Sequence, residues 1–262
     1  MNGWFVPAAT PASVSDLITP HLTVYRPEGE GPFKTILMFH DCGQDAEQQQ
    51  YWGQTFQSMG YAAVYVDSYA GRGITQERAL AKVCRGRELL GAQRAGDVLA
   101  AITWANQQIW TAKQDIVLMG WSHGAWSIMD AYALDQKGEL PYGLEQQFTA
   151  DLTSIRQVVL FYPYCGMASQ TNEHGWQQAP TVLAIDVAED SVVDSNACLQ
   201  SYDWMSNSGG GVQHHVLEGV DHAFDVDAVS QRENRTYRTA KPESLEAIER
   251  VKLLLRNFLD RS

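Results

Sequence analysis

The sequence predicts an α/β protein in which helices cover both faces of a mostly parallel sheet. Short apolar runs alternate with longer helical patterns over the whole chain, which is typical of this fold class. Several runs are apolar at every position, as expected for strands that are buried on both faces. No linker, internal repeat or low-complexity tract is present, so we expect one domain over residues 21–262. Residues 1–20 contain prolines but no periodicity and predict an irregular N-terminal arm.

The first half of the chain predicts an edge strand, two buried strands and two helices. Residues 21–26 alternate between apolar and polar side chains, which indicates an edge strand. Continuous apolar runs predict buried strands at 35–40 and 61–66. Helices are expected at 51–59 and 90–110. The second helix places one apolar face at Val98, Ile102, Ala105 and Ile109.

The second half continues the same alternation. A strand at 115–119 precedes an apolar run that starts at Ala125 and is too long for a strand, so it predicts a buried helix. Residues 140–153 are polar and predict an irregular connection. Further strands are predicted at 157–162, 180–185 and 212–217, and a last helix at 242–259. That helix places at helical spacing Leu245, Ile248, Lys252, Leu255 and Leu259.

A Gly-x-Ser-x-Gly motif, Gly120-Trp-Ser122-His-Gly124, lies between the strand at 115–119 and the following helix. In that position the motif is the sequence form of a nucleophile elbow. The serine occupies a sharp, strained turn with its hydroxyl exposed, and the flanking positions must be small because two backbones approach closely there. We therefore expect Ser122 to be a catalytic nucleophile.

An acid and a histidine follow the later strands in the order that such a serine requires. Asp190 comes after the strand at 180–185, and His222 comes after the strand at 212–217. Reactive groups gather at the carboxyl ends of parallel strands, and the order serine, acid, histidine is that of the α/β-hydrolases. Rival acids near Asp190 are Asp186, Glu189 and Asp194.

This set supplies the groups that acyl transfer requires. The histidine removes the serine proton during attack and returns it to the leaving group, while the acid fixes the histidine tautomer. The oxyanion that develops on the substrate needs backbone N–H donors. We expect one donor from His123, which follows the serine, and a second from Asp41-Cys42, which follows an early strand.

From about Thr35 to Leu259 these motifs resemble the dienelactone hydrolase family of α/β-hydrolases. The residues that carry the resemblance are Gly-Trp-Ser122-His-Gly, Asp190-Ser-Val-Val and Val-Asp-His222-Ala-Phe. The spacing of the acid in that family favours Asp190 over its rivals. The resemblance implies an α/β-hydrolase fold and a hydrolytic activity.

The same resemblance suggests a substrate contact. The segment Asp67-Ser-Tyr-Ala-Gly-Arg72 is similar to the region where the family carries a carboxylate-binding arginine, so Arg72 is expected to bind substrate. An ordinary loop arginine paired with an acid is an equal alternative. The chain has Ser122 in place of the family's cysteine, His40 in place of its glutamate and Val226 in place of its second arginine. Hydrolysis is thus expected to carry over better than dienelactone specificity.

Several aromatic side chains lie near these motifs. Trp121 is expected to contact substrate, Trp176 to line an entrance and Trp126 to lie in the core. The side chain of His123 is expected to be a structural or pocket residue rather than the base, because the base must approach Ser122 from another loop.

The net charge of −12 and the pI of about 4.9 argue against nucleic acid and membrane surfaces as partners. No apolar run approaches the ~20 residues of a membrane helix. The four cysteines fit no zinc-site spacing, and both free thiols and two disulfides are open. The chain shows no export signal, so we favour thiols and a cytoplasmic protein. A removed signal together with paired cysteines would place the protein in the periplasm or outside the cell.

The sequence therefore predicts a serine hydrolase that cleaves a small ester or lactone through an acyl-enzyme, without a metal or organic cofactor. No sizeable lid insertion is visible, so an open site for a small substrate is expected. A peptidase or acyl transferase on the same triad is an alternative. A binding protein on a hydrolase fold is another, but such a scaffold has no need of a complete serine, acid and histidine set.

Overall fold

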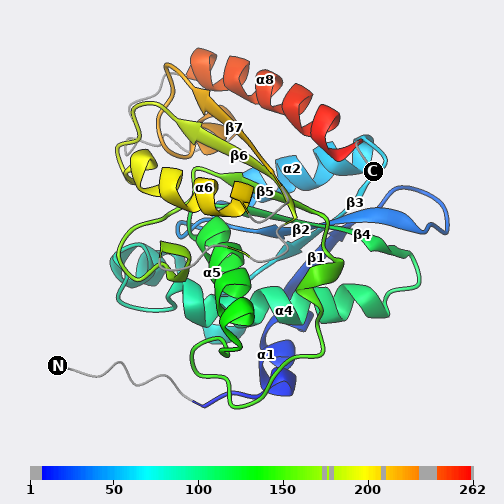
Figure 1. Ribbon diagram of the computed structural model, residues 1–262. Coiled ribbons are helices and arrows are strands. Elements are labelled where there is room, and N and C mark those ends of the chain that lie inside the picture. The colour runs from blue at the N-terminus through cyan, green and yellow to red at the C-terminus, as the bar shows by residue number, and fades with distance from the viewer. Residues whose placement is uncertain (1–7, 173–175, 177–179, 208–210, 230–240, 261–262) are drawn as a thin grey trace.

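The computed structural model describes residues 8–172, 176, 180–207, 211–229 and 241–260. Its centre is a seven-stranded sheet in the order β1-β3-β2-β4-β5-β6-β7 (Figure 1). The strand β1 is antiparallel to β3, and all other neighbours are parallel, which confirms the predicted sheet with its edge strand. The strands are β1 (Leu22–Tyr25), β2 (Phe33–Phe39), β3 (Ala62–Val66), β4 (Thr111–Trp121), β5 (Gln157–Phe161), β6 (Thr181–Val187) and β7 (Val212–Leu217).

Helices cover both faces of the sheet. On one face pack α1, α4, α5 and α6, and on the other α2, α7 and α8 (Figure 1). The connections between these elements in the described chain form no large lid domain. The helices are α1 (Pro11–Ile18), α2 (Ala46–Ser58), α3 (Gln76–Arg78), α4 (Gly91–Gln107), α5 (His123–Lys137), α6 (Leu199–Asn207), α7 (Phe224–Val229) and α8 (Lys241–Leu259).

The two apolar cores follow from alternation along the strands. In β2, Leu37 and Phe39 belong to the core beside α4 and α5, whereas Ile36 and Met38 belong to the core beside α2 and α8. Successive side chains of a strand point to opposite faces, so a strand that is covered on both sides needs an apolar residue at every position. This is why the buried strands were recognisable as continuous apolar runs.

The N-terminal arm is not irregular throughout, because residues 11–18 form α1. The side chain of Thr10 accepts a hydrogen bond from the backbone N–H of Ser13 and caps the helix. Pro11 occupies the first helical position, where its missing N–H costs nothing. The helix buries Val14 and Ile18 in the core. The prediction of an irregular arm is therefore wrong for residues 11–18, and residues 1–7 lie outside the described residues.

The predicted apolar faces of α4 and α8 each include a residue that is exposed in the structure. The side chain of Ile109 is 94% exposed because α4 ends at Gln107. Leu245, in the first turns of α8, is 48% exposed, whereas Ile248 and Leu255 are buried as predicted. The short helices α6 and α7 were not predicted at all.

Four cysteines form two disulfides. Cys42 is bonded to Cys84, and Cys165 is bonded to Cys198. The preference for free thiols was therefore wrong, because the fold brings together cysteines that lie far apart in the sequence. Among the described residues, no helix is both long enough and apolar enough to span a membrane.

Candidate active site

Ser122 lies in a strained turn between β4 and α5. Its φ of 48° and ψ of −107° are unfavourable for a residue that carries a side chain. A Cβ on Gly124 would lie 2.0 Å from the carbonyl oxygen of Phe39, and a Cβ on Gly120 would lie 2.5 Å from the backbone nitrogen of Ala125. Both positions require glycine, so the sharp turn that was predicted from the motif is present.

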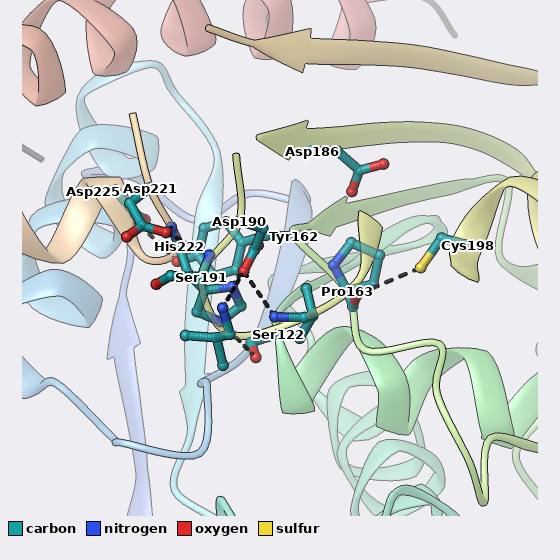
Figure 2. A network of polar contacts seen from close by, with 12 residues as sticks. Ser122, Tyr162, Pro163, Asp186, Asp190, Ser191, Cys198, Asp221, His222 and Asp225 are labelled. Atoms are coloured by element: carbon teal, nitrogen blue, oxygen red, sulfur yellow. Dashed lines mark hydrogen bonds and ion pairs between the residues drawn. The ribbon is translucent and has the colours of Figure 1, made fainter. Parts of the chain in front are cut away.

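A chain of hydrogen bonds joins Asp190, His222 and Ser122 (Figure 2). Nε2 of His222 lies 3.0 Å from Oγ of Ser122, and Nδ1 of His222 lies 2.8 Å from Oδ2 of Asp190. Asp190 follows β6, His222 follows β7 and Ser122 follows β4, so the parallel sheet brings the three residues together at the carboxyl ends of its strands. The side chains of His222 and Asp190 are 3% and 1% exposed, which shields their contact from water.

The structure separates Asp190 from its rival acids. The carboxylate of Asp186 is buried between a tyrosine hydroxyl of α6 and a histidine ring of β7, and Figure 2 shows it away from His222. Asp194 caps a short 3₁₀ turn with its carboxylate, and Glu189 is exposed. Asp190 is therefore the acid that faces Nδ1 of His222.

Asp221 connects the loop of the acid to the loop of the histidine. Its Oδ1 accepts hydrogen bonds from the backbone N–H of Ser191, at 2.8 Å, and from that of His222, at 2.7 Å. Oδ1 of Asp190 in turn accepts from two backbone N–H groups of its own loop. These bonds fix the loop of Asp190 against the loop of His222. Sequence reasoning missed Asp221, and its only signal was a carboxylate placed directly before the histidine.

A second missed residue, Asp225, organises the core behind the histidine. Its fully buried carboxylate accepts four hydrogen bonds of 2.6–2.8 Å. The donors are the side chains of Gln48, Trp52, Trp121 and Tyr162. Burial raises the pKa of Asp225, and the four donors oppose that rise. The ring of Tyr162 lies 4.6 Å from the ring of His222, so this cluster supports the histidine from behind.

The predicted contact of Trp121 with substrate is wrong. Its side chain is fully buried, its ring stacks on Phe161 at 4.9 Å, and its indole N–H donates within the cluster just described. The side chain belongs to the core beside α2 and α8 because of the strand alternation. Trp176, which was expected at an entrance, is also fully buried and stacks on Tyr132. Trp126 is buried as predicted.

The loop of residues 40–44, which follows β2, lies against the elbow. The Cβ position of Gly124 is 2.0 Å from the carbonyl oxygen of Phe39 and 2.7 Å from that of His40. Nδ1 of His40 donates to the carbonyl oxygen of Asp41 at 2.6 Å, and Nε2 accepts from the backbone N–H of Ser68 at 3.3 Å. These two bonds hold the ring of His40 between the 40–44 loop and the backbone of Ser68.

Asp41 is a buried carboxyl in the 40–44 loop. Its Oδ1 accepts from the backbone N–H of Gln44 at 2.7 Å, which fixes the turn of the loop. Burial is the largest influence on this carboxyl and raises its pKa to about 6. The hydrogen bond from Gln44 and the nearby His222 oppose the rise.

Arg94 is a buried cation between the 40–44 loop and the elbow. Its Nη1 donates to the carbonyl oxygen of His40 at 2.8 Å and lies 3.1 Å from Nδ1 of His123, while its Nε donates to the hydroxyl of Ser68. Burial and the charge of Arg94 lower the pKa of His123 to about 3, so this imidazole is neutral. The side chain of His123 is buried against Arg94, and sequence reasoning gave Arg94 no role.

Arg72 forms the ion pair that the alternative interpretation expects. Its guanidinium makes two hydrogen bonds, of 2.7 and 2.9 Å, to the fully buried carboxylate of Asp97 on α4 and a third to the carbonyl oxygen of Ser68. It also lines a cavity of about 740 Å³ between α1 and α4, and Ser122 and His222 do not line this cavity. The geometry thus favours a structural arginine over a substrate contact.

A model of the dienelactone hydrolase family matches residues 22–259. The chain belongs to this family. Membership confirms the resemblance expected from the sequence and makes the chain an ester-cleaving hydrolase. No match was found among curated proteins.

Solved structures of an esterase share the fold. An esterase from Thermogutta terrifontis with propionate bound has a TM-score of 0.60 and 18% identity, over 92% of this chain and 91% of that chain. A second structure of the same protein, esterase 2, phosphorylated by paraoxon, has a TM-score of 0.61 and 18% identity, over 92% of this chain and 90% of that chain. At this level of identity the likeness establishes the α/β-hydrolase fold and leaves the residue roles to the local geometry.

Proposed function

We propose that this dienelactone hydrolase family member is a serine hydrolase that cleaves a small ester or lactone through an acyl-enzyme. Ser122 is the nucleophile, His222 the general base and acid, and Asp190 the residue that orients the histidine. The observation that carries the proposal is the hydrogen-bonded chain from Asp190 through His222 to Ser122, with spacings of 2.8 and 3.0 Å. Such a chain activates a serine hydroxyl, which is otherwise a weak nucleophile at neutral pH.

The reaction proceeds in two halves. Oγ of Ser122 attacks the ester carbonyl carbon while Nε2 of His222 accepts its proton, and collapse of the tetrahedral intermediate releases the alcohol, which takes that proton. Water then attacks the acyl-enzyme by the same route and releases the acid. Throughout, Oδ2 of Asp190 accepts the Nδ1–H of His222 and keeps Nε2 directed at the serine.

Two backbone N–H groups are proposed to bind the oxyanion. The first is that of His123, which opens α5, where backbone N–H groups have no acceptor within the helix and the dipole favours negative charge. The second comes from Asp41 or Cys42. The support for it is the close packing of Gly124 on the carbonyls of Phe39 and His40, which places the start of the 40–44 loop beside the elbow.

We also propose that the substrate carries a short acyl group and that the protein functions in an oxidising compartment. Esterase 2 of Thermogutta terrifontis was solved with propionate bound and also phosphorylated by paraoxon, a small organophosphate. The described part of this chain carries no large lid that would bind a long chain. The two disulfides support function in the periplasm or outside the cell, where disulfides persist.

The test is a panel of p-nitrophenyl esters with acyl chains of two to twelve carbons, alongside a lactone and a peptide amide. We expect kcat/KM to be highest for the shortest acyl chains, and the amide to be inert. A preference for the amide would replace the esterase proposal with a peptidase. Inactivity on every ester and lactone would contradict the proposal altogether.

A further inference from the structure

A disulfide ties the 40–44 loop to the segment that follows β3. Cys42 directly follows Asp41, and its partner Cys84 lies at the end of a π-helical turn, Ala79–Val83. The two cysteines are 42 residues apart in the sequence, so the bond crosses from one strand-end loop to the next. The cross-link therefore holds the loop that is proposed to supply the second oxyanion donor.

Side chains of the same segment donate hydrogen bonds to carbonyl oxygens of the loop. The hydroxyl of Tyr69 donates to the carbonyl oxygen of Cys42, and Nε2 of Gln76 donates to the carbonyl oxygen of Gly43, both at 3.1 Å. Neither bond uses the N–H of Asp41 or Cys42. The segment thus restrains the loop through its carbonyl oxygens, by two bonds that do not involve the N–H groups proposed to bind the oxyanion.

The two disulfides differ in their access to solvent. Cys84 is exposed and Cys42 is half-buried, whereas Cys165 and Cys198 are 2% and 0% exposed. A reductant in solution therefore reaches the first disulfide well before the second, because exchange needs access of a thiolate to sulfur.

We propose that the Cys42–Cys84 disulfide positions the backbone N–H donors of the 40–44 loop, and that its reduction lowers turnover while the fold persists. This inference rests on the proposed serine hydrolase function. A dithiol reductant breaks the S–S bond by thiol–disulfide exchange, donates two electrons and becomes a cyclic disulfide, and Cys42 and Cys84 become thiols. The exposed disulfide thereby makes the activity sensitive to redox conditions.

The second disulfide offers a matched control. It joins the segment after β5 to the 3₁₀ turn just before α6. The loop of Asp190, which lies between these segments in the sequence, is held separately by Asp221, whose carboxylate accepts from the backbone N–H groups of Ser191 and His222. Loss of this disulfide is therefore expected to reduce stability without displacing the catalytic groups.

The first experiment compares two double variants with the wild type on a short-chain p-nitrophenyl ester. Cys42→Ser with Cys84→Ser should lower kcat about tenfold or more, less than the ~100- to 1,000-fold loss that follows removal of an oxyanion donor. KM and the pH dependence of kcat/KM should keep their wild-type form, because His222 and Asp190 are untouched. The control, Cys165→Ser with Cys198→Ser, should keep kcat within about twofold of the wild type while lowering Tm, since loss of a disulfide destabilises.

A second experiment avoids any risk that the variants fold poorly. The wild type is titrated with dithiothreitol, and free thiols are trapped with N-ethylmaleimide and located by mass spectrometry while activity and circular dichroism are followed. Activity should fall in step with labelling of Cys42 and Cys84, before Cys165 is labelled and before the dichroism changes. Activity that persists after complete labelling of Cys42 and Cys84 would overturn the inference.

The two proposals fail in different ways. If the Cys42→Ser, Cys84→Ser protein matches the wild type in kcat, the positioning role is wrong and the serine hydrolase proposal stands. An equal loss of kcat in both double variants would show a general effect of lost stability and would also reject the positioning role. Retained ester hydrolysis in Ser122→Ala would reject the proposed function itself.

Discussion

Replacement of Asp41 by asparagine measures the cost of a buried carboxylate beside the candidate site. Burial raises the pKa of Asp41 from its ordinary value of 3.8 to about 6, and the charges of Asp225 and Asp45 add to this rise. The N–H of Gln44 and the charge of His222 act in the opposite direction. Asparagine keeps an acceptor for the N–H of Gln44 and carries no charge, so it isolates the electrostatic effect.

The sign of the effect follows from linkage. A carboxyl whose pKa is higher in the folded state binds its proton more tightly there, so its favourable contribution is complete below pH ~4 and is lost as the pH rises through about 6. A difference of about two pKa units corresponds to about 3 kcal/mol. The stability of Asp41→Asn relative to the wild type should therefore rise by about 2–3 kcal/mol between pH 4 and pH 7.5.

The assay is urea unfolding of both proteins at pH 4, 5, 6 and 7.5, followed by tryptophan fluorescence. Asp41→Ala is the control, since it removes the charge together with the acceptor for the N–H of Gln44. The stability of Asp41→Ala should depend on pH in the same way as that of Asp41→Asn, and should be lower at each pH. A constant difference between Asp41→Asn and the wild type across this range would refute the reasoning.

Three further predictions test the site. Asp190→Asn should lower kcat about 10⁴-fold at unchanged Tm, because it favours the wrong histidine tautomer. Asp186→Asn, measured alongside, should lose far less activity, and the reverse order would show that the wrong carboxylate was chosen. Arg72→Ala should destabilise the fold by about 3–5 kcal/mol, because Asp97 is left buried without its partner, and should affect carboxylate-bearing and neutral esters equally; a selective loss on the charged ester would restore the substrate role. Gly124→Ala should lower stability by about 3 kcal/mol or more, because its Cβ meets backbone, and a wild-type Tm would contradict the close packing at the elbow.

The sheet, and the placement of Ser122, Asp190 and His222 at neighbouring strand ends, were predictable because their signals are local. Strands buried on both faces require apolar residues at every position, and catalytic groups follow the strand ends in a fixed order. The two glycines of the Gly-x-Ser-x-Gly motif also have a local steric cause, since backbone atoms occupy the positions where a Cβ of Gly120 or Gly124 would lie. These features need no knowledge of distant contacts.

The remaining features depend on contacts that no local pattern reveals. The four donors to Asp225 come from α2, β4 and the end of β5, so only the folded chain identifies that carboxylate as a hub. Trp121 stands next to the nucleophile in sequence, yet the strand alternation turns its side chain into the core. Arg72 finds Asp97 only when β3 and α4 pack together. The partner of Cys42 is likewise set by the tertiary fold.

The most direct test of the account is to treat the protein with paraoxon and to locate the added phosphoryl group by peptide mass spectrometry, with Ser122→Ala treated in parallel. We expect a single diethylphosphoryl adduct on Ser122, loss of ester hydrolysis in proportion to labelling, and neither label nor more than about 10⁻⁴ of the wild-type kcat in the alanine variant. Labelling at another residue, or ester hydrolysis that survives in Ser122→Ala at near the wild-type rate, would contradict the account.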